Sequence, residues 1–348
     1  MTTPTRRAKL GLAINATLVA LAFGLLGLVI WRNREKIQDV FSHPLDLRLL
    51  ALAQAIYLIG LVSTFFRWFF LVRVIDPRFT LRAAILLGFI GNVFNLVIPG
   101  AVGGDLIKAA YLVRMHIKKT QAIASMVIDR IVGLLGLFIL ATIAGAFAWP
   151  SASGDVAKLI VAAWVATGLG VLVLAVIFGQ LITRIFPQLG TGHSRLSLIT
   201  SELKEMSTTY RRRLDVVSFC TLMSMGNHSL NVLAFYLVGR MLFPSMTTTF
   251  VDHFLMAPLT FFTMAVPLPF GALGLTEGIS EQLFNLVGHP SGSLAMMGFR
   301  VLMYGGGLVG ACVYLAKLKE VRGLTAAAHQ IEDEMIEGDM RDEEPDRS

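Results

Sequence analysis

The chain has 348 residues, 55% of them hydrophobic and only 15% charged, and a mean hydropathy of +0.68, which excludes an ordinary soluble domain of this length. The net charge of +7 does not require a nucleic-acid partner, because membrane proteins also gather lysine and arginine in their cytoplasmic loops. The only cysteines, Cys220 and Cys312, lie inside apolar stretches, which argues against a disulfide or metal site. We expect an all-α integral membrane protein without cofactor or metal.

Long uncharged stretches follow one another along the chain, and a helix that crosses the hydrocarbon core needs roughly 20 apolar residues. The first stretch follows Arg6, Arg7 and Lys9, as the core of a secretory signal would. No small-residue cleavage site follows it, so we expect a retained helix. The stretches are Leu10–Trp31, Leu49–Phe66, Ala83–Gly104, Ile131–Gly154, Leu159–Thr183, Val216–Gly239, Phe254–Thr276 and Val301–Ala316.

Lysine and arginine in the connections predict which side of the membrane each one faces. Simple alternation fails twice, because residues 73–82 and 114–119 are both basic and residues 241–251 and 288–293 both lack basic residues. The single apolar block between the members of each pair must therefore enter the membrane and return on the same side. The other basic connections are 1–9, 184–213 and 317–322, and residues 150–155 are non-basic and expected outside.

Each of these two blocks contains a helix-breaking motif. Pro99-Gly-Ala-Val-Gly103-Gly104-Asp105 interrupts the first block, and Pro269-Phe-Gly271-Ala-Leu-Gly274-Leu-Thr-Glu277 interrupts the second. The shared Gly-Ala-x-Gly, followed by an acid, predicts a duplication. We predict about six spanning helices plus two re-entrant helix pairs in two inverted-topology repeats, residues 10–148 and 157–316, an architecture of many secondary transporters. Arg32, Arg34 and Lys36 would face outward, against the charge rule.

Charged residues inside the membrane are costly and normally pair or line a cavity. Arg130 follows Asp105 by 25 positions, and Arg300 follows Glu277 by 23. Arg130 lies ten residues into its helix, roughly 15 Å deep, so both arginines should approach the midplane from opposite faces. We predict a substrate site without catalytic or metal-binding residues. Its members are Asp105, Arg130, Glu277 and Arg300, together with Asn95, Gly103, Gly104, Gly271 and Gly274.

Structural roles compete with binding roles for several of these residues. Asp105 could be the N-cap of the helix that follows it, and the acid–arginine pairs could only fix helix packing. Arg67, near an interface, is expected to extend toward water. Asn227, His228 and Asn231 are expected to form interhelical hydrogen bonds. The sequence leaves these alternatives open.

Both motifs together, with Asp129-Arg130 after the first and Arg300 after the second, resemble the lysylphosphatidylglycerol synthase transmembrane region, also called the flippase-like domain family. The resemblance covers roughly residues 10–316. It implies a bacterial or archaeal inner-membrane protein that moves lipids, in some members an aminoacylated phospholipid. Members commonly have glutamate and arginine where this chain has Asp105 and Lys108. The soluble transferase domain of the fused members has no counterpart here.

The function we predict from the sequence is translocation of a polar lipid through a charged site at the midplane, without enzymatic chemistry. An ion or small-solute transporter, or a membrane subunit that supports a glycosyl- or aminoacyl-lipid transferase, is the alternative. Membrane lipids are the expected partners, with a homo-oligomer or a partner transferase left open. Residues 1–9 and the tail 317–348 are expected in the cytoplasm. The tail should be disordered, because residues 331–348 carry nine acids and two arginines.

Overall fold

The computed structural model describes residues 6–97, 103–152, 154–179, 207–265 and 268–318, and every regular element in these ranges is helical. The first five residues and most of the predicted tail lie outside them, so the location of both ends stays a prediction. The helices are α1 Arg6–Arg32, α2 Arg34–Ser42, α3 Leu47–Ile75, α4 Leu81–Val97, α5 Gly103–Arg114, α6 Lys119–Ala148, α7 Gly154–Gly179, α10 Leu214–Leu242, α11 Phe250–Phe262, α12 Pro269–Ala272, α13 Leu275–Asn285 and α14 Gly292–Ala316, with short 3-10 turns η1 Trp149–Ser151, η3 Arg211–Arg213 and η4 Thr263–Ala265.

Four of the described helices, α3, α6 with its η1 extension, α7 and α14, are long and apolar enough to cross a membrane. The pair α1–α2 would form a fifth crossing, with a bend of 64° at the break between its two helices. Helix α10 is as long as α3 but carries Ser224, Asn227 and His228 near its middle, and it packs against α3, α6 and α14. The prediction of an all-helical membrane protein is confirmed.

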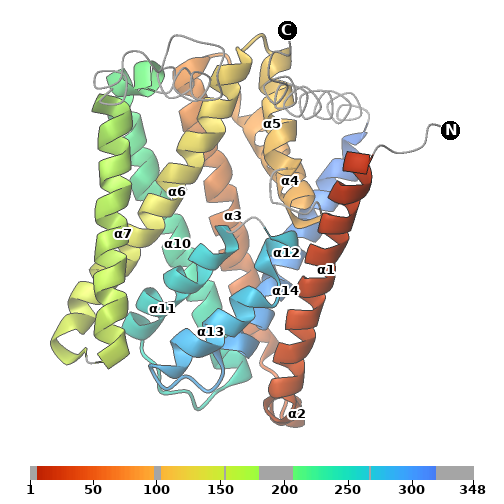
Figure 1. Cartoon of the computed structure of the whole chain (residues 1–348), viewed down its shortest axis with the longest axis vertical. Helices are drawn as coiled ribbons and strands as arrows, with labels where there is room; N and C mark the ends of the chain where they lie inside the picture. Colours follow the sequence, from red (N-terminus) through yellow and green to blue (C-terminus); the bar gives the residue numbers. More distant parts are fainter. Residues whose placement is uncertain (1–5, 98–102, 153, 180–206, 266–267, 319–348) are drawn as a thin grey trace, which may run out of the picture.

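Two sets of shorter helices lie where the sequence predicts re-entrant pairs. Helices α4 and α5 have 17 and 12 residues, and α11 and α13 have 13 and 11, too few to cross the roughly 30 Å hydrocarbon core. Figure 1 shows α4 and α5 in the upper half of the molecule and α11 and α13 in the lower half. This placement agrees with hairpins that enter from opposite sides. The predicted inverted repeat stays a prediction, and Pro99 with Gly100 lies outside the described residues.

Close helix packing at small residues forms the core. A β-carbon added at Gly136 of α6 would lie 2.6 Å from the side chain of Ser224 on α10, so these helices approach more closely than larger residues would allow. About three turns further along α10, Phe235 stacks on Phe284 of α13 with ring centroids 5.1 Å apart. Helix α1 is peripheral and packs mainly on α12, α13 and α2. The hairpin α11–α13 is therefore held between the core and α1.

Candidate functional site

The second predicted acid–arginine pair forms inside the protein. Arg300 of α14 makes an ion pair with Glu277 in the first turn of α13, and both side chains are buried. The guanidinium also donates through Nη1 to the carbonyl oxygen of Phe270 at 2.7 Å and through Nη2 to that of Gly271 at 2.9 Å. Glu277 Oε2 accepts a hydrogen bond from the backbone N–H of Gly274 at 2.6 Å. Arg300 thus connects α14 both to the backbone of the α12 turn and to the first turn of α13.

The backbone of this turn requires its glycines. Phe270, Gly271, Ala272 and Gly274 all have positive φ, a region that costs little only for glycine. A β-carbon at Gly274 would lie 2.6 Å from the backbone nitrogen of Leu26 on α1, a distance that real contacts do not reach. Gly271 and Gly274 therefore act through backbone shape, and Arg300 stabilises the strained turn by donating hydrogen bonds to its carbonyl oxygens.

The guanidinium of Arg300 has five N–H groups, and its contacts with Glu277 and two carbonyls use most of them. A buried charge that is this fully bonded has little capacity left for a ligand. In the conformation described, the structural alternative fits Glu277 and Arg300 better than direct substrate binding does. That Glu277 and Arg300 bind substrate stays a prediction.

The first predicted pair is much more open. Arg130 of α6 binds Asp105 of α5 through Nε at 2.9 Å and Nη2 at 2.6 Å. Lys108 Nζ lies 3.6 Å from the other carboxylate oxygen of Asp105 and 5.1 Å from the ring centre of Trp68. The Arg130 side chain is 48% exposed, although it lies eleven residues after Lys119, the first residue of a helix of membrane-spanning length. This cluster of Asp105, Lys108 and Arg130 has a formal charge of +1 and is accessible from outside the protein through Arg130, while Asp105 and Lys108 are largely covered.

The approach of α4 and α5 positions this cluster. Asn95 Oδ1 accepts a hydrogen bond from the backbone N–H of Gly104 at 2.9 Å, so this side chain bonds the free N-terminus of α5. A β-carbon at Gly104 would lie 2.1 Å from the carbonyl oxygen of Gly91, so only glycine fits there. Helix α5 begins at Gly103, which places Asp105 inside the first turn and not at the cap. The N-cap interpretation of Asp105 is therefore wrong.

The expectation that Arg67 extends toward water is also wrong. Arg67 of α3 is buried and binds both carboxylate oxygens of Asp129, at 2.8 and 3.0 Å. It also donates to Ser224 Oγ at 3.0 Å, and Ser224 in turn donates to the carbonyl oxygen of Gly133 at 3.1 Å. The neighbours Asp129 and Arg130 thus point to different sides of α6. The charged Asp129 beside Arg130 was the signal that could have revealed this pair.

The polar residues of α10 only partly form the expected interhelical hydrogen bonds. His228 Nε2 lies 3.1 Å from the carbonyl oxygen of Gly133 on α6, as expected. The Oδ1 atoms of Asn227 and Asn231 have no hydrogen-bond partner and lie next to Gly60 of α3.

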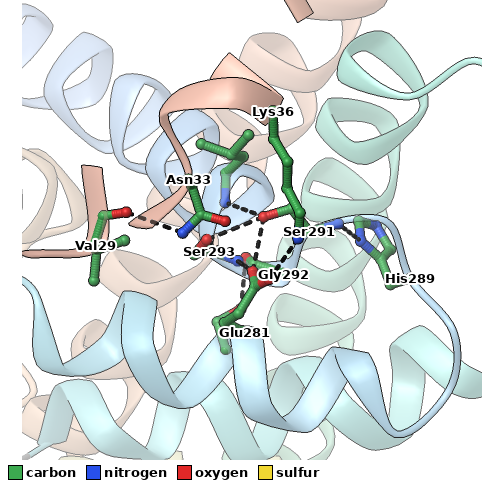
Figure 2. A network of polar contacts seen from close by, with 10 residues as sticks. Val29, Asn33, Lys36, Glu281, His289, Ser291, Gly292 and Ser293 are labelled. Carbon is green, nitrogen blue, oxygen red and sulfur yellow. Dashed lines mark hydrogen bonds and ion pairs between the residues drawn. The ribbon is translucent and has the colours of Figure 1, made fainter. Parts of the chain in front are cut away.

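A further polar network, not predicted from the sequence, lies at the end of α13. Figure 2 shows Glu281 between Lys36 of α2 and the start of α14. Its carboxylate accepts hydrogen bonds from Lys36 Nζ at 2.9 Å, from the Ser291 hydroxyl at 2.7 Å, and from the N–H and hydroxyl of Ser293 at 2.9 and 2.8 Å. Burial lowers the pKa of the nearby His289 to about 4, and its neutral Nδ1 accepts from the Ser291 N–H. This network fastens α2 to α13 and to the start of α14.

No cluster of three or more histidine, cysteine, aspartate or glutamate side chains that could hold a metal occurs in the ranges that the structure covers. The comparison with curated proteins gave no match. The family model described as the lysylphosphatidylglycerol synthase TM region matches residues 8–310, nearly the whole helical part of the chain. With its helical membrane fold and both acid–arginine pairs in place, the chain belongs to the family of the lysylphosphatidylglycerol synthase transmembrane region.

Proposed function

We propose that this protein translocates a polar lipid across the membrane and performs no covalent chemistry on it. The family supports a lipid-related membrane function. The observation that carries the proposal is the cluster of Asp105, Lys108 and Arg130, because charges inside a membrane protein normally pair and are covered, whereas the Arg130 side chain is paired but still 48% exposed. The cargo would be a phospholipid or a lipid-linked precursor.

The chemistry of the open cluster suits a phosphate-containing headgroup. Arg130 can offer two parallel N–H donors to a phosphate, and Lys108 adds a second positive charge beside it. The Asp105 carboxylate accepts hydrogen bonds from Arg130 Nε and Nη2 and compensates the positive charge of the guanidinium. A headgroup that also carries an amino group could bind Asp105 when its phosphate displaces that carboxylate.

The contrast between the two acid–arginine pairs favours transport by alternating access. The Asp105 pair is open while the Glu277 pair is sealed, and each lies on a short broken hairpin. Transporters with inverted repeats expose a central site first to one side and then to the other. In this proposal the sealed pair opens when the first one closes. The protein would act in a bacterial or archaeal inner membrane with both termini in the cytoplasm.

The proposal can be tested by reconstituting the full chain in vesicles that contain a fluorescent phospholipid. The rate at which inner-leaflet label becomes accessible to an added quencher is compared with protein-free vesicles. Faster exchange for a phosphate-bearing lipid supports translocation. No exchange for any anionic, aminoacylated or polyprenyl-linked lipid, combined with solute uptake, would replace it with solute transport. If neither lipid exchange nor solute uptake is observed, a role as a membrane subunit of a partner transferase would be favoured.

A further inference from the structure

A large apolar cavity lies between α1, α4, α12 and α14. Its volume is about 590 Å³, within the roughly 300 to 1,000 Å³ of pockets that hold small molecules. Figure 1 shows these four helices gathered in the same part of the molecule. The walls include Leu96 of α4, Phe270 and Leu273 around the α12 turn, and Tyr304 and Ala311 of α14. Both broken hairpins therefore contribute to one cavity.

The cavity opens to the surface of a membrane-spanning helix. Leu308 of α14 lines it and is 68% exposed, and Phe23 of α1 and Tyr304 are also exposed. Water is disfavoured in a space with such walls, because it needs two to four polar partners. At the depth of a spanning helix, the surrounding medium is lipid hydrocarbon. An acyl chain is therefore the occupant whose chemistry and location fit the cavity.

The cavity also adjoins both charged pairs. Phe270 lines it with its side chain and gives its carbonyl oxygen to Arg300. Leu96 also lines the cavity and directly follows Asn95, whose side-chain oxygen accepts a hydrogen bond from the backbone N–H of Gly104, the residue before Asp105. An acyl chain in the cavity would thus touch the backbone segments that hold Arg300 and Asp105.

We infer that this cavity binds one acyl chain of a membrane phospholipid while the headgroup of the same lipid is handled by the charged residues. The inference rests on the proposed lipid translocation and adds where the hydrocarbon part of the cargo lies. Helix α1 forms one wall and meets the α12 turn through an edge contact between Phe23 and Phe270, with ring centroids 5.5 Å apart. Because α1 packs mainly on α12, α13 and α2, the chain would enter between α1 and α14.

Photo-crosslinking tests this site without measuring transport. The purified full chain is mixed in mild detergent with phosphatidylglycerol that carries a diazirine in the middle of one acyl chain, and crosslinked residues are located by mass spectrometry. Ala311→Phe fills the cavity with a ring, whereas Cys312→Phe places the same ring on the exposed neighbouring position. Crosslinks should concentrate at residues 270–273 and 304–311, and should fall at least about threefold in Ala311→Phe but not in Cys312→Phe.

Two results would overturn the inference: crosslinks spread equally over exposed positions such as Leu172 of α7, or equal labelling of both variants. Removal of the label by polyprenyl phosphate, but not by an excess of unlabelled phosphatidylglycerol, would also contradict an acyl-chain site. If the crosslinks appear as expected but the vesicles show no leaflet exchange, the proposed translocation is wrong, whereas the proposed acyl-chain site is supported.

Discussion

At the scale of single residues, the two predicted arginines have different environments despite their similar sequence positions. Arg300 is surrounded by a carboxylate and two backbone carbonyls, whereas Arg130 shares a carboxylate with Lys108 and is half exposed. The spacing from acid to arginine predicted both partners correctly. It could not predict accessibility, because that depends on which other helices cover each hairpin. We therefore propose that, in this conformation, a headgroup contacts Arg130 while Arg300 holds the α12 turn.

Arg67 and Asp129 should behave as a buried structural pair. Arg67→Met leaves the Asp129 carboxylate buried without its partner and should destabilise the protein by about 3 to 5 kcal/mol. The double variant Arg67→Met/Asp129→Leu should recover most of that loss, since no unpaired charge remains. Denaturant titration of the purified variants in detergent measures the difference. A double variant as unstable as the sum of the two single variants would show that the pair is not coupled.

At the scale of elements, the sequence predicted the broken helices well but not the details of the breaks. Proline and glycine lie between α4 and α5 and between α11 and α13, where the apolar blocks divide into shorter helices, and the side from which each hairpin enters the membrane stays a prediction. The positive φ values of Phe270 and Ala272 had no sequence signal, because residues with side chains rarely adopt that region. The turn is held by Arg300, which donates to the carbonyl oxygens of Phe270 and Gly271 and lies 30 and 29 positions further along the chain.

Gly274 should be irreplaceable where α1 crosses the turn. Gly274→Ala introduces a β-carbon that meets the Leu26 backbone, at a positive φ, and should cost about 1 to 3 kcal/mol. Gly278→Ala on the same helix is the matched control, because its β-carbon would meet nothing within 4 Å. It should be neutral or slightly stabilising. Thermal unfolding in detergent compares the two, and equal melting temperatures would contradict the close packing of α1.

At the scale of the whole molecule, the orientation of the two hairpins follows from the charge of their connections. Lys118, between α5 and α6, should face the cytoplasm, and Asn285, at the end of α13, should face outward. Both side chains are exposed, so single cysteines there, in a Cys312→Ala background, can react with a membrane-impermeant maleimide. Labelling of residue 285 in intact cells, and of residue 118 only after lysis, is expected. Labelling of both from the same side would contradict inverted hairpins.

The whole-molecule arrangement also explains why sequence reasoning missed part of the site. The apolar cavity is built from four helices whose individual residues look like ordinary membrane-facing side chains. Likewise, Lys36 and Glu281 are 245 positions apart, and nothing in either local sequence indicates that they meet. Sequence motifs indicate which residues lie near a helix break. Cavities and ion pairs between distant residues form only when the helices pack.

One comparison in reconstituted vesicles can show whether a lipid headgroup passes the cluster at Asp105. The rate of leaflet exchange of a fluorescent phospholipid is measured for the unmodified chain, for Arg130→Gln, and for Lys158→Gln, which removes an exposed charge paired only with Asp155 at the start of α7. Loss of one well-formed charged contact should slow exchange about tenfold in Arg130→Gln and leave Lys158→Gln unchanged. Equal rates for all three proteins, with all three correctly folded, would contradict the account.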